Sequence, residues 1–128
     1  MAMILIVDDH PGMAAAVAAT VRSEGYDVAV VHGGAEAVEY VRGRPVDLMV
    51  LDAMMPEVSG LDVLETLRRE GSEGRPPVVM YSGHDDTRAD ALRLGAVAFV
   101  SKVEPEKLLE AIDVHTGKAP PARGRWAV

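Results

Sequence analysis

Short apolar runs and longer segments of helical periodicity alternate five times along the chain. The apolar runs predict strands at residues 3–7, 27–31, 47–51, 78–81 and 97–100. The periodic segments predict helices at residues 13–24, 34–42, 60–70, 87–94 and 104–116. Strands that are apolar throughout are typical of a parallel sheet covered on both faces. The pattern therefore favours repeated βα units around one sheet.

Glycine and proline mark the ends of the expected elements. Gly25, Gly71 and Gly95 follow helical segments, where a helix commonly stops. Pro11 and Pro105 stand where a first helical turn accepts proline. Five βα units with right-handed crossovers predict an α/β, flavodoxin-like (βα)5 fold, with a five-stranded parallel sheet of order 2-1-3-4-5 and helices on both faces.

One domain is expected at residues 1–117, followed by a flexible basic tail at 118–128. The chain of 128 residues has the usual size of a single domain. The tail contains Pro120-Pro121 and no apolar periodicity. It could dock on an acidic partner, with Trp126 as an anchor, or serve as a linker.

The expected domain is acidic. The sequence holds 20 acidic and 13 basic residues, for a formal charge of −7, and three of the basic residues lie in the tail. Because nucleic-acid binding relies on clustered Lys and Arg, direct contact of this domain with nucleic acid is not expected. The longest nearly apolar stretch, residues 13–21, is too short to span a membrane, and no signal peptide is indicated. The lack of cysteine excludes disulfides and thiolate metal sites and fits a cytoplasmic location.

Polar side chains follow four of the expected strands at the point where each strand ends. These residues are Asp8, Asp9, Asp52, Ser82 and Lys102. The carboxyl ends of parallel strands meet at one edge of a sheet, which is where open α/β sheets bind ligands. Three carboxylates, a hydroxyl and an ammonium at one edge indicate a hard divalent cation and a phosphoryl group.

The three carboxylates each have an alternative interpretation. Asp8 and Asp9 would repel each other if left bare, and a divalent cation such as Mg²⁺ removes that conflict. They could equally be acids that favour the start of a helix. Asp52 could attack phosphorus as a nucleophile, or could be a turn or capping residue.

Ser82 and Lys102 are also ambiguous when taken alone. The Ser82 hydroxyl could bond a phosphoryl oxygen, or it could bond the nearby backbone of its own turn. Lys102 could be a fixed counter-charge for the carboxylates and a phosphate, or a solvated surface lysine. The hypothesis of a cation and phosphoryl site rests on the order of these five residues along the chain and not on any one of them.

The chain resembles a receiver domain of a two-component response regulator over about residues 2–116. The segments that carry the resemblance are residues 4–10 (ILIVDDH), 47–52 (DLMVLD), Met55-Pro56 with Gly60, Tyr81-Ser82-Gly83, and 95–102 (GAVAFVSK). The resemblance implies that Asp52 accepts a phosphoryl group from a histidine kinase or phosphotransfer protein. It further implies a site for Mg²⁺ (or Mn²⁺) that is built by Asp8, Asp9, Asp52 and the backbone carbonyl of Met54, with Asp8 acting partly through water.

The resemblance also implies how a signal leaves the site. Ser82 and Lys102 would contact the phosphoryl group, and Phe99 would be the switch aromatic that turns inward. The output surface would be the fourth helix, fifth strand and fifth helix, which bind a downstream protein, and a homodimer could form on phosphorylation. Met54 and His84 flank the site and would modulate hydrolysis, although His84 could simply be a solvated loop histidine.

Two positions depart from the family pattern. Val103 follows Lys102 where the family usually has proline, so we expect a trans peptide bond and a somewhat altered loop there. Phe99 replaces the more frequent tyrosine and lacks its hydroxyl.

Two other functions compete with the switch. The chain could be a phosphorylation-independent receiver that acts as a protein–protein interaction module. It could also be a phosphohydrolase with an aspartyl nucleophile. Such enzymes usually place the nucleophile and a second carboxylate two residues apart after the first strand, but two residues after Asp8 this chain has His10. We expect no enzymatic turnover beyond the domain's own phosphorylation and dephosphorylation. We expect either a stand-alone receiver or the receiver portion of a longer protein.

Overall fold

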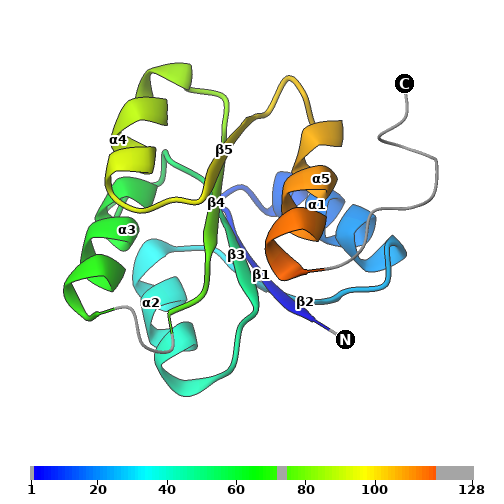
Figure 1. The fold of residues 1–128 in the computed structure, drawn as a ribbon, viewed down its shortest axis with the longest axis horizontal. Helices are drawn as coiled ribbons and strands as arrows, with labels where there is room; N and C mark the ends of the chain where they lie inside the picture. Colours follow the sequence, from blue (N-terminus) through cyan, green and yellow to red (C-terminus); the bar gives the residue numbers. More distant parts are fainter. Residues whose placement is uncertain (1, 72–74, 118–128) are drawn as a thin grey trace.

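Five parallel strands form one sheet in the spatial order β2-β1-β3-β4-β5 (Figure 1). The computed structural model describes residues 2–71 and 75–117. The strands are β1 (Met3–Val7), β2 (Asp27–Val31), β3 (Leu48–Leu51), β4 (Val78–Ser82) and β5 (Ala98–Ser101). All four neighbouring pairs are parallel, which confirms the predicted α/β topology.

Helices cover both faces of the sheet, as the apolar strands predicted. They are α1 (Pro11–Ser23), α2 (Gly34–Gly43), α3 (Gly60–Arg69), α4 (Arg88–Arg93) and α5 (Glu106–Thr116). In Figure 1, α1 and α5 lie on one side of the sheet, whereas α2, α3 and α4 lie on the other. In the described part of the chain, no helix is long and apolar enough to cross a membrane.

Three helix starts differ from the prediction. The first helix, expected from residue 13, begins at Pro11. The segment expected as one helix at 87–94 is a 3₁₀ turn, η1 (Asp85–Thr87), followed by α4. Neither η1 nor α4 has a side-chain cap hydrogen bond. Thr87 instead donates its hydroxyl to the His84 carbonyl at 2.7 Å, a local bond that competes with regular helix formation. Pro105 is the N-cap of α5 rather than part of its first turn.

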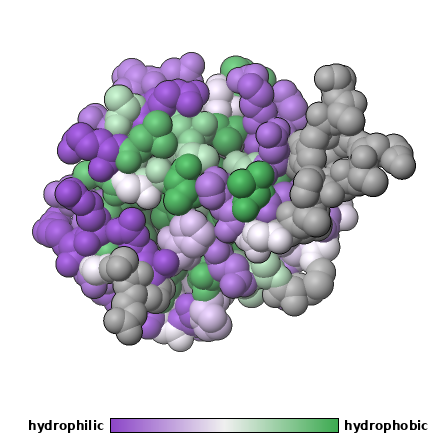
Figure 2. All heavy atoms as spheres, viewed as in Figure 1, coloured by the Kyte–Doolittle hydropathy of each residue, from purple (hydrophilic) through white to green (hydrophobic). Residues whose placement is uncertain are grey.

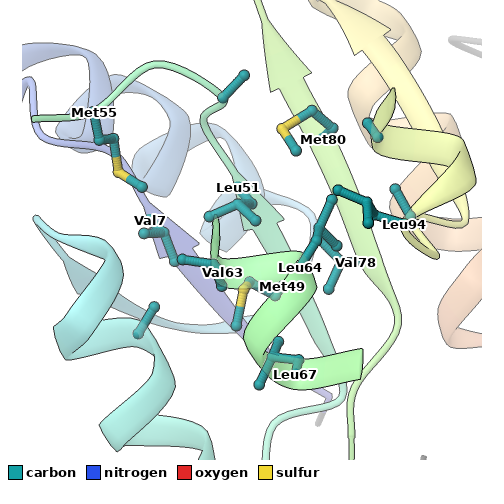
Figure 3. Packing of buried hydrophobic residues seen from close by; sticks show 14 of the residues in the cluster. Val7, Met49, Leu51, Met55, Val63, Leu64, Leu67, Val78, Met80 and Leu94 are labelled. Carbon is teal, nitrogen blue, oxygen red and sulfur yellow. The ribbon is translucent and has the colours of Figure 1, made fainter. Parts of the chain in front are cut away.

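The core is split into two layers by the alternation of side chains along the central strands. Leu5 and Val7 of β1 face α2 and α3, whereas Ile4 and Ile6 face α1 and α5. Figure 3 shows the first layer, in which Met49 and Leu51 of β3 pack with side chains of α3 and β4. Since both faces are buried, the strands read as continuous apolar runs.

Glycine allows the chain to turn sharply after three of the helices. Gly25, Gly71 and Gly95 adopt positive φ after their helices, the conformation that glycine tolerates best. Residues 118–128, where the basic tail was expected, lie outside the described residues.

Candidate functional site

The carboxyl ends of β1, β3, β4 and β5 surround one hollow of about 320 Å³. Backbone hydrogen bonds continue one residue past the ends of β1 and β3. Asp8 N–H donates to Val31 O at 3.2 Å, and Asp52 N–H donates to Val7 O at 3.0 Å. The residues that line the hollow are Asp8, Asp9, His10, Met13, Asp52, Met54, Gly83, His84 and Lys102. The ends of separate strands thus place the acidic residues and the lysine in one pocket.

Three carboxylates form the acidic part of the hollow. Asp8, Asp9 and Asp52 each offer an oxygen, and these oxygens lie within 4.8 Å of one another. Asp8 and Asp52 are buried, whereas Asp9 is exposed. Carboxylate oxygens with room for water and phosphate are the ligands that Mg²⁺ prefers, so this cluster fits a hard divalent cation.

The Asp52 carboxyl has a raised pKa. Burial is the largest cause, and the charges of Asp8 and Asp9 raise the pKa further. The Lys102 ammonium and a bond from the Met54 N–H to Asp52 Oδ1, at 3.4 Å, act in the opposite direction. The charged form of Asp52 is therefore sensitive to any cation that enters the hollow.

Lys102 bridges the two buried carboxylates. Its Nζ lies 3.2 Å from Asp8 Oδ2 and 3.6 Å from Asp52 Oδ2. The described residues contain no cis peptide bond, so the Lys102–Val103 bond is trans, as predicted. Val103 N–H donates to Ser101 Oγ at 3.3 Å, a bond that proline could not make. Lys102 thus contacts both carboxylates in a chain that has valine at the next position.

Ser82 is buried beside the hollow, and its hydroxyl bonds its own turn. Ser82 Oγ accepts a hydrogen bond from His84 N–H at 3.0 Å, which is the local contact raised as its alternative interpretation. Lys102 N–H donates to Ser82 O at 2.9 Å, so the two residues are joined through the backbone. His84 is exposed at the rim, and Met54 is 53% exposed.

Phe99 lies away from the hollow, under α4. Its side chain is 8% exposed and belongs to the core layer that α4 covers. The guanidinium of Arg88 stacks over the ring, with 4.6 Å between Cζ and the ring centroid.

Two histidines to which the sequence analysis gave no role form hydrogen bonds with Asp8 at the end of β1. His32 Nδ1 donates to the Asp8 carbonyl at 2.9 Å. His10 N–H donates to Asp8 Oδ1 at 2.9 Å, and His10 Nδ1 accepts from Met13 N–H at 3.2 Å, which caps α1. The position of His10 before Pro11 could have indicated a cap. No residue near His32 in the sequence indicates that it bonds to Asp8.

Gly60, expected as the first residue of a helix, lies against the Asp52 backbone. A Cβ at Gly60 would be 2.2 Å from the Asp52 carbonyl oxygen and 2.8 Å from Ala53 Cα. Gly60 N–H also donates to Ala53 O at 2.9 Å. Glycine thus allows the start of α3 to support the loop after Asp52.

Comparison with known proteins agrees with this geometry. The sequence pattern of the response regulator receiver domain matches residues 4–113, and the chain belongs to this family. The DNA-binding response regulator MtrA of Mycolicibacterium smegmatis is 37% identical over 112 residues, which cover 85% of this chain and 48% of MtrA. The nitrate/nitrite response regulator NarL of Escherichia coli K12 is 36% identical over 115 residues, covering 87% of this chain and 53% of NarL.

The chain thus spans about half the length of these curated relatives. Among solved structures, the response regulator TrrA from Thermotoga maritima, in complex with Mg²⁺ and BeF, has a TM-score of 0.82 and 27% identity, covering 90% of this chain and 99% of TrrA. A signal receiver domain from Bermanella marisrubri has a TM-score of 0.81 and 31% identity, covering 88% of this chain and 95% of that domain. The chain is a receiver of two-component signalling.

Proposed function

We propose that the chain accepts a phosphoryl group on Asp52 from a histidine kinase or phosphotransfer protein, in a Mg²⁺-dependent reaction that switches a protein-interaction surface. The observation that carries the proposal is the meeting of three carboxylates with Lys102, whose Nζ lies 3.6 Å from Asp52 Oδ2. In this reaction a carboxylate oxygen of Asp52 attacks the phosphorus of a phosphohistidine, the P–N bond breaks, and the imidazole leaves with that electron pair.

Residues in the hollow and Ser82 beside it would take separate parts in this transfer. Asp8, Asp9 and Asp52, with the backbone carbonyl of Met54, would hold Mg²⁺ (or Mn²⁺), which neutralises charge on the transferred group. Lys102 can exchange its contact with Asp52 for one with a phosphoryl oxygen. Ser82 would release the His84 N–H and bond the phosphoryl group. His84 and Met54, at the rim, would modulate the access of water.

The output surface of the proposal is formed by α4, β5 and α5. Leu92 of α4 is 45% exposed, Val97 before β5 is 41% exposed and Val114 of α5 is 65% exposed. Figure 2 shows apolar side chains gathered across the middle of this face. Such a surface suits a downstream protein partner or a second copy of the chain on phosphorylation. We propose no direct nucleic-acid contact by this acidic domain, a cytoplasmic location, and no turnover beyond its own phosphorylation and dephosphorylation.

Phosphoryl uptake tests the proposal. The full chain with Mg²⁺ and acetyl phosphate should gain one phosphoryl group by intact mass, and the gain should disappear in Asp52→Ala and with EDTA. Asp27→Asn is the matched control, because Asp27 is an exposed acid at the opposite end of the strands. No uptake, together with no binding of Mg²⁺ or beryllofluoride by calorimetry, would contradict the proposal and favour the phosphorylation-independent interaction module.

A further inference from the structure

Phe99 has a cationic partner from a neighbouring element. Arg88 Cζ lies 4.6 Å from the centroid of the Phe99 ring, and the ring is otherwise buried. A guanidinium within about 6 Å of a ring face is attracted by the negative charge of the π-system. The ring therefore lies between the core and an exposed arginine.

The charge of Arg88 is directed to the ring rather than to a carboxylate. Arg88 is the first residue of α4, and its backbone N–H donates to Asp85 O. Asp86 and Asp90 are also near it in sequence, yet Arg88 forms no ion pair with any acid that the structure describes. Asp90 pairs with Arg93 at 3.2 Å instead.

The Phe99 ring and the Ser82 hydroxyl lie on the same side of adjacent strands. In the register of β4 and β5, Met80 pairs with Phe99 and Ser82 pairs with Ser101. Because side chains alternate along a strand, Ser82 and Phe99 both face α4. The connection from Ser82 at the end of β4 leads directly to Arg88, the first residue of α4. A shift at Ser82 could therefore be passed along this connection to Arg88.

We propose that Arg88 is a positioning residue that holds the Phe99 ring inward and couples the ring to Ser82. The inference rests on the proposed function, because it assigns the route by which a phosphoryl group at Asp52 reaches the ring. Phenylalanine has no hydroxyl with which to find a hydrogen-bond partner, and the arginine supplies a contact through the ring face instead. Loss of this contact lowers the affinity for a phosphoryl analogue by about two- to fivefold, by linkage.

Ring position can be tested without any ligand. Phe99 is the only phenylalanine of the chain, so ring-¹³C phenylalanine labels it alone. In Arg88→Gln, the ring signals should shift, and the ring should become more accessible to a dissolved paramagnetic agent. Arg93→Gln removes a guanidinium from the other end of α4 and should leave both unchanged. Unchanged ring signals and accessibility in Arg88→Gln would overturn the proposal.

Coupling can be tested with beryllofluoride and Mg²⁺ as the probe. Fluorination of the Phe99 ring withdraws negative charge from its face at nearly constant shape. Mono-, di- and trifluorinated phenylalanine should lower beryllofluoride affinity stepwise in the chain with Arg88, but not in Arg88→Gln. Equal responses in both chains would overturn the coupling. If the unsubstituted chain binds no beryllofluoride, the proposed function fails. The ring experiment still decides whether Arg88 positions the Phe99 ring.

Discussion

At the scale of single residues, the surroundings of Asp52 disfavour the charged form of its carboxyl. Burial is the largest cause that raises its pKa, and repulsion from Asp8 and Asp9 raises the pKa further, whereas the Lys102 ammonium lowers it. An acid with a higher pKa in the folded state binds its proton more tightly when folded. Stability therefore falls as the pH rises from the unfolded pKa to the folded pKa, and the penalty is constant above that window.

Asp52→Asn should remove this penalty. We expect the variant to be more stable than the wild-type chain at pH 7 without Mg²⁺, and the difference should disappear below about pH 4, where unfolded aspartate is also protonated. Urea unfolding in EDTA across this pH range measures the difference. Asp27→Asn, at an exposed position, should show no such gain. A variant that is less stable than the wild type at pH 7 would contradict the assigned electrostatics.

Gly60 should tolerate no side chain. A Cβ there meets the Asp52 carbonyl oxygen at 2.2 Å, and that atom is backbone, so Gly60→Ala must displace the loop that carries Asp52. We expect a loss of about 1–3 kcal/mol in the free energy of unfolding, together with slower phosphoryl uptake. Gly43→Ala is the matched control, because nothing lies within 4 Å of its Cβ position. Equal effects of the two substitutions on stability would contradict the close approach at Gly60.

At the scale of elements, the start of α3 is fixed by a capping box next to Asp52. Ser59 Oγ accepts from Asp62 N–H at 3.1 Å, and Asp62 Oδ2 accepts from Ser59 N–H at 3.0 Å. Ser59→Ala should lower the free energy of unfolding by about 1 kcal/mol, as for other N-caps. Ser23→Ala, which removes an exposed hydroxyl at the end of α1, should change it by less. Thermal or urea unfolding checks this, and equal losses would argue against the cap.

Strands and strand-end residues were predictable because their signals are local. Each described strand begins and ends within one residue of its predicted range. Parallel pairing then brings Asp8, Asp52 and Lys102 together without further information. The 3₁₀ turn before α4 and the bond from His32 to the Asp8 carbonyl were not predictable. The first depends on a hydroxyl of Thr87, and the second joins residues 24 positions apart in sequence.

At the scale of the whole molecule, charge and site act together. The chain carries a formal charge of −7, so any cation screens its self-repulsion to some degree. A specific site differs from screening because it stabilises only the folded state that brings three carboxylates within 4.8 Å of one another. The two effects can therefore be separated by comparing Mg²⁺ with NaCl at equal ionic strength.

Mg²⁺ should stabilise the chain through this site. At a hundred times its dissociation constant, a ligand that binds only the folded state adds about 2.7 kcal/mol to the free energy of unfolding. NaCl should add much less, since it offers no divalent cation to the carboxylates. Asp9→Asn should lose most of the gain from Mg²⁺ while folding normally without it, because Asp9 is exposed. Urea unfolding with each salt makes the comparison. If Mg²⁺ and NaCl stabilise equally, or if Asp9→Asn gains as much as the wild type, Mg²⁺ acts on the charge of the whole molecule and not through the hollow at the strand ends.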